Sequence, residues 1–365
     1  MRILVILPEG FGGNCGIALY NRDILTALCA HPDCTEIVAI PRIMPNVLEE
    51  IPEKLTYVVE GINSKLRYIS TVFKTTKKNT RFDLIICGHI NLLPVAYLLH
   101  LWLKVPIVLE IYGIEAWKPR SWFSNYLVNK IDTFISISDL TKNSFLEWAK
   151  LEPQQGFVLP NVIHTELYGI GAKKTALVQR YNLEDKTVLM TLGRMSTSER
   201  YKGFDEILEV LPTLAKQISN VVYLAVGSGN DQQRLGEKAK TLGIAKRVIF
   251  TGYVDEKEKA DHYRLADVYV MPSRGEGFGF VVLEAMACGI PVVASTSDGT
   301  KEAVRNGKLG LLTDPTKPDE IIACILEALN YPKKVPEGIE YFSFQNFSRS
   351  LYDIIAQVRK TWIER

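Results

Sequence analysis

Short, continuous runs of apolar residues alternate with longer amphipathic stretches along the chain. The first run, ILVIL at 3–7, lacks the polar alternation of a half-exposed strand, and such continuity is typical of strands buried on both faces of a parallel sheet. The stretch at 17–28 that follows has apolar residues at helical spacing. Similar strands are predicted at 36–40, 82–87, 106–111 and 132–138. The N-terminal part is therefore predicted to be a parallel sheet covered by helices.

The same pattern begins again in the second half. Strands are predicted at 186–193, 221–227, 247–253, 267–272 and 291–295, alternating with polar helices. Two successive βα series predict an α/β protein of two doubly wound, Rossmann-like parallel-sheet domains. A Pro/Asn-containing connector follows a strand near residue 157, so we place the domains at 1–163 and 164–340, with a final helix at 341–365. Such domains normally face each other across a cleft, which is the default site.

Composition narrows the class of protein. Of the 365 residues, 47% are hydrophobic and 23% are charged, which excludes a disordered chain. The formal net charge is only +2, so nucleic acid is a poor candidate for the main partner. The six cysteines form no C-x-x-C pair, which favours the reduced thiols of a cytoplasmic protein. The N-terminal apolar run is too short for a signal peptide, and polar residues interrupt the longest apolar stretch, 90–103, so no membrane-spanning segment is predicted.

The most informative segment is RGEGFGFVVLEAMACGIPVVAS, from Arg274 to Ser295. It follows a predicted strand and becomes a helix near Gly279. The free N–H groups at such a helix start carry about half a positive charge and can hold a phosphate without a metal. Glu276 and Glu284 flank this start, and a carboxylate can accept two hydrogen bonds from a vicinal diol. Taken alone, the spacing fits a binding site no better than it fits a solvated Glu276 in a turn and an ordinary Glu284 on a helix surface.

Two cations in the same half strengthen the functional interpretation. Arg194 comes directly after a predicted strand, and Lys202 with Gly203 comes directly before a predicted helix. At the carboxyl edge of one sheet, two such cations can neutralise a diphosphate leaving group. Either residue alone would be interpreted as a surface charge, whereas the pair beside the glutamate segment favours a catalytic site.

Taken together, these motifs resemble a known enzyme family. The motifs are GR at 193–194, KG at 202–203, VGSG at 226–229, GYV at 252–254 and the E-x7-E segment that begins at Glu276. The chain resembles the retaining glycosyltransferases of family 4, which have the two-domain GT-B fold. The resemblance covers nearly the whole chain and is densest between 188 and 303. It implies transfer of a sugar from a nucleoside diphosphate donor with retention at the anomeric carbon, and a C-terminal helix that packs back on the first domain.

The resemblance also implies roles for individual residues. Arg194 and Lys202 would contact the donor diphosphate, Glu276 the hydroxyls of the transferred sugar and Glu284 the ribose. We therefore expect Arg194, Lys202 and Glu276 to be catalytic. The backbone N–H groups of Phe278 and Gly279 would face the sugar, those of Phe280 and Val281 the phosphate, and Tyr253 and Val254 would edge the base.

The N-terminal half fits the family less cleanly. The family has Gly-Gly before its first helix, and Gly12 with Gly13 offers such a pair. Counting back along the predicted helix places the usual pair at Cys15 and Gly16 instead, so Gly16 is the better candidate for close approach to the phosphate. The segment GFGGNCG is also a near miss to the dinucleotide-binding fingerprint, which keeps a dehydrogenase open as an alternative.

A second departure lies at a strand end in PIVLEIYGIEAW. Tyr112 stands where the family usually has a histidine near the donor sugar. A phenol can hydrogen-bond a sugar hydroxyl but does not titrate near neutral pH. Tyr112 is therefore a candidate donor contact of altered character. His89, at the end of another predicted strand, could line the acceptor side, although a structural histidine fits the sequence as well.

Several kinds of chemistry find no support in the sequence. No H-E-x-x-H, G-x-S-x-G or D-x-D motif occurs, so metal-dependent hydrolysis, a serine esterase and a metal-chelating sugar transferase are not indicated. We expect Arg194, Lys202 and the helix start to hold the diphosphate with no metal and no cofactor.

The acceptor is less well defined. The stretch 65–81 has six cations, no acid and interleaved apolar residues, and three aromatic residues follow at 117, 122 and 123. Such a surface could contact anionic lipid or a lipid-linked acceptor at the cytoplasmic membrane face, but a solvated helix face explains it equally well.

The sequence thus predicts a retaining, metal-independent transferase that acts on a carbohydrate or lipid-linked saccharide in polysaccharide or glycoconjugate synthesis. A UDP-hexose such as UDP-glucose is the first choice of donor, and GDP-mannose is the second. A nucleotide-sugar epimerase or phosphorylase on the same fold and a non-catalytic protein that binds sugar nucleotides remain alternatives.

Overall fold

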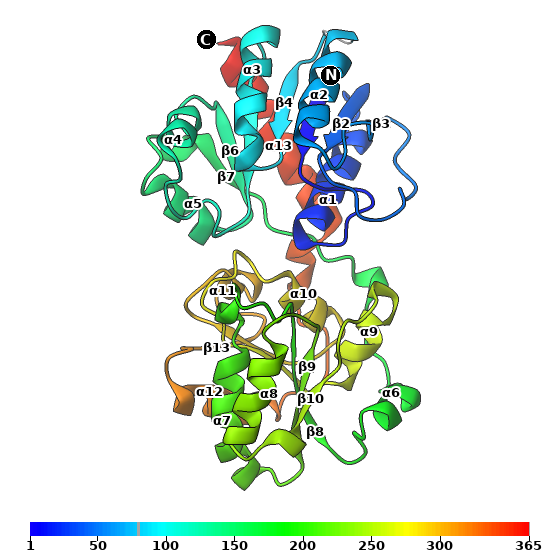
Figure 1. Cartoon of the computed structure of the whole chain (residues 1–365), viewed down its shortest axis with the longest axis vertical. Coiled ribbons are helices and arrows are strands. Elements are labelled where there is room, and N and C mark those ends of the chain that lie inside the picture. Colours follow the sequence, from blue (N-terminus) through cyan, green and yellow to red (C-terminus); the bar gives the residue numbers. More distant parts are fainter. Residues whose placement is uncertain (79–80, 365) are drawn as a thin grey trace. The chain divides into compact units, whose positions relative to one another are not determined.

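The computed structural model describes residues 1–78 and 81–364, so two residues of the basic stretch 65–81 and the last residue of the segment 341–365 lie outside the described part. The chain divides into two compact units (Figure 1). The first comprises Met1–Val162 and Phe344–Arg365, and the second comprises Ile163–Ser343. The second unit is one continuous segment, whereas the C-terminal segment belongs to the first unit.

The first unit is built on a seven-stranded parallel sheet. Its strands are β1 (Arg2–Leu7), β2 (Glu36–Pro41), β3 (Leu55–Tyr57), β4 (Leu84–Cys87), β5 (Ile107–Ile111), β6 (Thr133–Ser136) and β7 (Gly156–Val158). They are ordered β3-β2-β1-β4-β5-β6-β7, and every pairing is parallel. Ile3 of β1 is opposite both Ile37 and Leu84. The carboxyl ends of all seven strands therefore meet at one edge of the sheet.

Helices cover both faces of this sheet. They are α1 (Gly16–Ala30), α2 (Lys65–Lys78), α3 (Leu93–Leu103), α4 (Trp122–Val128), α5 (Asp139–Leu146) and α13 (Phe344–Ile363), with 3₁₀ helices η1 (Ile90–Leu92) and η2 (Pro153–Gln155). The connections through α2, α3, α4 and α5 all step across the sheet in one direction, whereas the connection through α1 steps in the other. Because such crossovers are right-handed, α2–α5 lie on one face and α1 on the opposite face. The C-terminal helix α13, red in Figure 1, packs against α1.

Local sequence signals explain several of these elements. The Ser121 and Ser138 side chains accept hydrogen bonds from backbone N–H groups at the starts of α4 and α5. In α13, Phe347, Leu351 and Ile355 are buried at helical spacing, which gives the helix one apolar face.

The second unit repeats the architecture with six strands. They are β8 (Thr187–Leu192), β9 (Val221–Val226), β10 (Val248–Phe250), β11 (Val268–Met271), β12 (Val292–Ser295) and β13 (Leu311–Thr313), ordered β10-β9-β8-β11-β12-β13 with parallel pairing. The helices are α6 (Thr175–Arg180), α7 (Phe204–Gln217), α8 (Gln232–Thr241), α9 (Glu256–Leu265), α10 (Phe280–Ala287), α11 (Thr300–Ala303) and α12 (Pro318–Ala328), with η3 (Thr165–Leu167), η4 (Arg200–Lys202), η5 (Ala245–Arg247) and η6 (Ile339–Phe342).

The predicted fold class of two parallel-sheet α/β domains is confirmed. The apolar pattern missed the strands β3 and β13, which are each only three residues long. That the two sheets face each other across a cleft stays a prediction. Among the described residues, no helix is both long and apolar enough to span a bilayer. All six cysteines are free thiols.

Candidate functional site

The glycine-rich turn between β11 and α10 has a conformation that only glycine allows. Gly279 directly precedes α10 and has φ +87°. A Cβ at this position would lie 2.6 Å from Cγ2 of Thr300, so both the backbone and the space require glycine. The first N–H groups of a helix have no carbonyl partner within the helix. The turn therefore presents Phe280 and Val281 at the carboxyl edge of the sheet, as the sequence predicts, while Phe278 is buried against the ring of Phe342.

Asp298, which sequence reasoning missed, holds the backbone of this turn through hydrogen bonds. It is buried, and its Oδ2 accepts hydrogen bonds from the N–H groups of Gly275 (3.1 Å) and Glu276 (2.9 Å). Its Oδ1 accepts from the hydroxyl of Thr300 at 2.7 Å. The backbone of Glu276 is thus held on both sides, since its carbonyl also accepts from the N–H of Gly299. No local motif signals this role, because Asp298 lies 22 residues further along the chain.

The structure brings three of the predicted residues together. Lys202 Nζ donates to Glu276 Oε1 at 2.7 Å, and it lies 3.7 Å from Glu199 Oε2. Arg194 also pairs with Glu199, with Nε 3.2 Å from the same Oε2 and Nη2 beside Oε1. The side chains form a continuous series Arg194–Glu199–Lys202–Glu276. Glu199 is the member that sequence reasoning missed.

The charge state of Lys202 follows from these neighbours. Burial disfavours the ammonium form, but the carboxylates of Glu276 and Glu199 outweigh burial and raise the pKa of Lys202. Lys202 is therefore a cation at neutral pH, largely withdrawn from water and held beside the start of α10. Arg194 differs, because its side chain is 71% exposed.

Two loops that carry these residues are locked to each other. The N–H of Met195 donates to the carbonyl of Ser228 at 3.0 Å, and the N–H of Asp231 donates to the carbonyl of Met195 at 2.9 Å. A Cβ on Gly229 would lie 2.0 Å from the Met195 carbonyl oxygen, and one on Gly227 would lie 2.1 Å from that of Gly193. The glycines of the VGSG motif are thus required by contact between loops of the protein.

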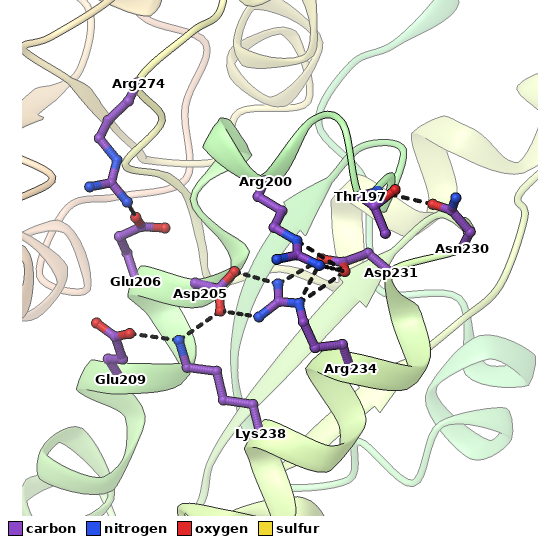
Figure 2. Close-up of polar contacts among 10 residues, drawn as sticks. All are labelled: Thr197, Arg200, Asp205, Glu206, Glu209, Asn230, Asp231, Arg234, Lys238 and Arg274. Atoms are coloured by element: carbon purple, nitrogen blue, oxygen red, sulfur yellow. Dashed lines mark hydrogen bonds and ion pairs between the residues drawn. The ribbon is translucent and has the colours of Figure 1, made fainter.

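A network of ion pairs next to these loops joins α7 and α8 (Figure 2). Arg234 of α8 bridges two aspartates, Asp205 of α7 and Asp231, which directly precedes α8. Its Nη2 lies 2.6 Å from a carboxylate oxygen of each. Burial opposes ionisation of Asp205, but Arg234 and Lys238 outweigh it and lower the pKa of Asp205 to about 2. The same network includes Arg200, which pairs with Asp231, and Glu209, which pairs with Lys238. Two separate contacts lie nearby, Thr197 with Asn230 and Glu206 with Arg274. The network fixes α7 and α8 relative to the loop that carries Arg194 and Lys202.

Glu284 has an environment that the sequence did not indicate. It is fully buried, and Oε1 accepts hydrogen bonds from Lys259 Nζ and the Tyr168 hydroxyl, each at 2.7 Å. Oε2 accepts from the Tyr263 hydroxyl at 2.6 Å. Burial works against the charge of Lys259, but Glu284 and Glu256 raise its pKa. Contact of Glu284 with a ribose stays a prediction, and in this structure both carboxylate oxygens already bind protein donors.

The GYV turn lies beyond β10. Its Gly252 forms an isolated bridge with Gly227, and Tyr253 is 71% exposed beside the partly exposed Val254. An exposed phenol at this edge of the sheet is free to stack on a base, but the contact itself stays a prediction.

In the first unit, the three candidate glycines have different surroundings. Gly12 has φ +80° and a Cβ there would lie 2.5 Å from Met44. A Cβ on Gly13 would lie 2.8 Å from that of Ala18. Gly16 begins α1 and a Cβ there would meet nothing within 4 Å. Packing thus explains Gly12 and Gly13, and only Gly16 has open space beside a helix start.

Tyr112 and His89 lie close together at the carboxyl edge of the first sheet. Their rings stack with centroids 6.4 Å apart. The Tyr112 hydroxyl oxygen lies 2.8 Å from Glu110 Oε2, 2.9 Å from the Gly88 carbonyl and 3.2 Å from Asn21 Oδ1. His89 accepts a hydrogen bond from the N–H of Asn91 and so caps η1, and burial lowers its pKa. Both polar groups already have protein partners, and their contacts with donor or acceptor stay predictions.

Glu110 is the unexpected member of this cluster. It is 1% exposed, and its Oε1 is buried without a hydrogen-bond partner. Burial raises the pKa of Glu110 to about 7, although the hydrogen bond with Tyr112 works in the opposite direction. A protonated Glu110 can donate to the Tyr112 oxygen, which leaves the single phenolic hydrogen for the Gly88 carbonyl.

Known proteins resemble the chain at two levels. Residues 173–341 match a family model described as "Glycosyl transferases group 1". A GDP-mannose-dependent alpha-(1-6)-phosphatidylinositol monomannoside mannosyltransferase from Mycolicibacterium smegmatis is 36% identical over 163 residues, which is 43% of this chain and 42% of that protein. Mannosylfructose-phosphate synthase from Agrobacterium fabrum is 36% identical over 158 residues, 41% of this chain and 34% of that protein. These matches span less than half the length of either relative.

Solved structures extend the likeness to the whole fold. The Anabaena protein Alr3699/HepE, in complex with UDP and glucose, has a TM-score of 0.75 at 20% identity and covers 98% of this chain and all of its own. Sucrose-phosphate synthase from Thermosynechococcus elongatus has a TM-score of 0.76 at 20% identity, covering 99% of each chain. The fold is thus that of the GT-B glycosyltransferases, and the predicted resemblance to this group of enzymes is confirmed.

Proposed function

We propose that this protein transfers a sugar from a nucleoside diphosphate donor to an acceptor hydroxyl, with retention at the anomeric carbon and without a metal or cofactor. The observation that carries the proposal is the placement of Lys202, which lies 2.7 Å from Glu276 beside the glycine-rich start of α10. A buried cation, a carboxylate and free helix N–H groups at one sheet edge suit a sugar diphosphate.

The mechanism follows from where charge develops. Breaking the glycosidic bond of the donor leaves negative charge on the diphosphate, which Arg194, Lys202 and the N–H groups at the start of α10 would stabilise. When a diphosphate takes the ammonium of Lys202, the carboxylate of Glu276 becomes available for sugar hydroxyls. The acceptor hydroxyl would attack from the face that the leaving phosphate occupies, and these residues act by position and charge, without a covalent intermediate.

Two donors are supported by different comparisons. GDP-mannose is supported by a relative named as a GDP-mannose-dependent mannosyltransferase, which is 36% identical over 163 residues. UDP-glucose, our first choice from the sequence, is supported only by fold neighbours at 20% identity. GDP-mannose is therefore at least as good a candidate as a UDP-hexose. For the acceptor we keep a carbohydrate or a lipid-linked saccharide, used at the cytoplasmic side of a membrane.

A binding panel tests the proposal and separates the donors. The full chain is mixed with GDP, UDP, GDP-mannose, UDP-glucose or NAD, and the unfolding temperature is measured. A ligand at 100 times its dissociation constant stabilises the folded state by about 2.7 kcal/mol, so the correct base shifts the transition clearly. Stabilisation by NAD alone would overturn the proposal in favour of a dehydrogenase.

Activity measurements then test the residues. With the preferred donor, Lys202→Ala and Glu276→Ala should each lower the rate of transfer or donor hydrolysis by about 10²- to 10³-fold, since each removes a group that acts on the reacting atoms. Lys240→Ala removes an exposed lysine of the same unit and is the matched control. NMR of the product reports the anomeric configuration, and full activity after chelator treatment is expected of a metal-independent enzyme.

One observation favours a second candidate, a protein that binds sugar nucleotides without catalysis. The hydroxyl of Tyr112, where the family usually has histidine, is directed to the interior polar groups of Glu110, Gly88 and Asn21. Nucleotide-sugar binding without any hydrolysis or transfer would support this candidate. Turnover that Glu276→Ala abolishes would exclude it.

A further inference from the structure

The charge of the chain is unevenly distributed. Residues 65–130 contain ten Lys and Arg against three Asp and Glu, a net charge of +7, whereas the rest of the chain has 33 against 38, a net charge of −5. The three acids of the basic segment offset only three of its ten positive charges. Asp83 accepts from the N–H of Arg2, Glu115 accepts from the N–H groups that follow β5, and Glu110 is buried. The overall balance of +2 therefore conceals a strongly basic region.

Topology places the helices of this basic segment on one face of the first unit. These helices, α2, α3 and α4, all lie on the same side of the sheet. Helix α3 packs against α4. Phe73 of α2 stacks on Trp102 of α3, with ring centroids 6.2 Å apart and an interplanar angle of 29°. The three helices thus form one surface, which we call the α2–α4 surface.

Large apolar side chains protrude from the α2–α4 surface into solvent. Leu66 of α2 is 82% exposed and Trp122 of α4 is 81% exposed. Between them, Leu98, Leu101 and Trp102 of α3 are about half exposed and share one helix face. Phe123 adds a further exposed ring next to Trp122. Exposed apolar side chains that are gathered on one face mark an interaction site.

Cations accompany these apolar groups. On α2 they are Lys65, Arg67, Lys74, Lys77 and Lys78, and none of the five is in an ion pair within the described residues. Arg67, Lys74 and Lys78 line a groove of about 510 Å³ together with the hydroxyls of Ser70 and Thr71 and the carboxylate of Glu60. The inward side of α2 buries Tyr68, Val72 and Thr76. The helix therefore turns its cations and Leu66 outward together.

We propose that the α2–α4 surface docks on an anionic lipid bilayer, with Leu66, Trp122 and the exposed side chains of α3 entering the interface and the cations of α2 contacting lipid phosphates. Charge complementarity selects the partner, since each cation near an anionic membrane contributes to binding. Apolar and aromatic side chains beside cations are what an interfacial helix presents to lipid. This inference goes beyond the proposed function and does not depend on its nucleotide chemistry.

Vesicle flotation of the full chain tests the inference. The chain should bind phosphatidylcholine vesicles that contain about 30% phosphatidylglycerol and should bind pure phosphatidylcholine vesicles at least tenfold more weakly. Binding should weaken as salt rises from about 0.1 M to about 1 M, because the Debye length falls from about 10 Å to about 3 Å. Failure to bind anionic vesicles would overturn the inference, and so would equal binding to both kinds of vesicle.

Variants separate the two contributions. The double variant Lys74→Gln/Lys78→Gln should lower the partition constant about 25-fold, at about fivefold for each charge removed. Trp122→Ala should lower it about tenfold or more, because a large apolar side chain no longer leaves water. The matched controls lie in the second unit. Lys240→Gln/Lys246→Gln and Leu167→Ala change exposed residues there and should alter binding less than twofold.

A second measurement distinguishes insertion from surface attraction. Vesicles with brominated acyl chains should quench the tryptophan fluorescence of the wild-type chain, and Trp122→Phe should lower that quenching. Polyuridylate RNA serves as the competing polyanion. Retention of RNA with no quenching by brominated lipid would show a nucleic-acid surface and overturn the inference.

Discussion

At the scale of single residues, Glu110 places an ionisable group where water does not reach. Its carboxyl lies between the Tyr112 hydroxyl and the Gly88 backbone, and no cation pairs with it among the described residues. Folding therefore favours the protonated form, and burial raises the pKa from 4.5 to about 7. Below pH 4.5 the carboxyl group is neutral in both the folded and the unfolded chain, and its contribution to the free energy of unfolding is fully present. This contribution is lost as the pH rises from 4.5 through about 7.

We expect Glu110→Gln to remove this pH dependence. A shift from 4.5 to about 7 corresponds to about 3 kcal/mol between pH 4 and pH 8, at 1.36 kcal/mol for each pKa unit. The variant, which cannot ionise, should gain about that much stability relative to wild type as the pH rises. Urea unfolding of both proteins across this range measures the difference. Glu53→Gln changes an exposed acid of the same unit, and if its pH profile matched that of Glu110→Gln, the buried carboxyl would not be the cause.

Glu199 affects the candidate site in a different way. It holds Arg194 and lies 3.7 Å from Lys202, so both cations expected to bind diphosphate already have a carboxylate neighbour. An incoming diphosphate must compete with Glu199 for Arg194 and is repelled by its charge. Replacement by glutamine removes the competition and leaves the side-chain size unchanged.

Glu199→Gln should therefore raise the affinity for GDP or UDP about fivefold, which corresponds to about 1 kcal/mol. Titration calorimetry at constant ionic strength measures this affinity. Glu209→Gln also removes a carboxylate from the second unit, but its partner is Lys238, away from the predicted phosphate contacts. Weaker binding by Glu199→Gln would show that Glu199 positions the cations and does not compete for them.

At the scale of elements, α9 and α10 are joined through one buried carboxylate. Glu284 of α10 accepts from Lys259 and Tyr263 of α9 and from Tyr168, which follows η3. Three elements thus meet at a group from which water is excluded. Helix α10 is held by this anchor, and the glycine-rich turn before it is held by Asp298.

Lys259→Met should destabilise the second unit by about 3–5 kcal/mol, because it keeps most of the side-chain volume but leaves a buried carboxylate without its cation. Adding Glu284→Gln should recover part of the loss. Thermal unfolding of the single and double variants measures both effects. Lys257→Met removes an exposed lysine of the same helix and is the control. A Lys259→Met protein as stable as this control would mean that the two tyrosines suffice for Glu284.

The elements also show what the sequence can and cannot predict. Continuous apolar runs identify the long strands. Gly279 marks the start of α10 in the sequence, and the structure requires glycine there because φ is positive. The residues that fix the site were missed because their partners are distant in sequence. Lys259 is 25 residues from Glu284, and Asp298 is 22 residues from Glu276, so neither produces a local pattern. The burial of the Glu110 and Glu284 carboxyl groups could not be predicted either. A single glutamate in a sequence does not show whether its carboxyl group faces water or protein.

At the scale of the whole molecule, the two units differ in how the chain completes them. Ile163–Ser343 forms the second unit without interruption, whereas the first needs the C-terminal helix α13 to cover α1. Phe347 meets the ring of Tyr20 edge-on with centroids 5.7 Å apart, and the Tyr352 hydroxyl donates to the carbonyl of Ala27 at 2.8 Å. Five apolar side chains of α13 are buried in total.

Truncation after residue 343 should therefore unfold the first unit and spare the second. Burial of five such side chains contributes about 10 kcal/mol at about 2 kcal/mol each, which is comparable to the whole stability of a domain. Differential scanning calorimetry should lose one transition, and the remaining transition should still rise in temperature with GDP or UDP. Truncation after residue 359 keeps the buried stripe of α13 and should retain both transitions. If the longer deletion removed both transitions, the two units would not fold independently.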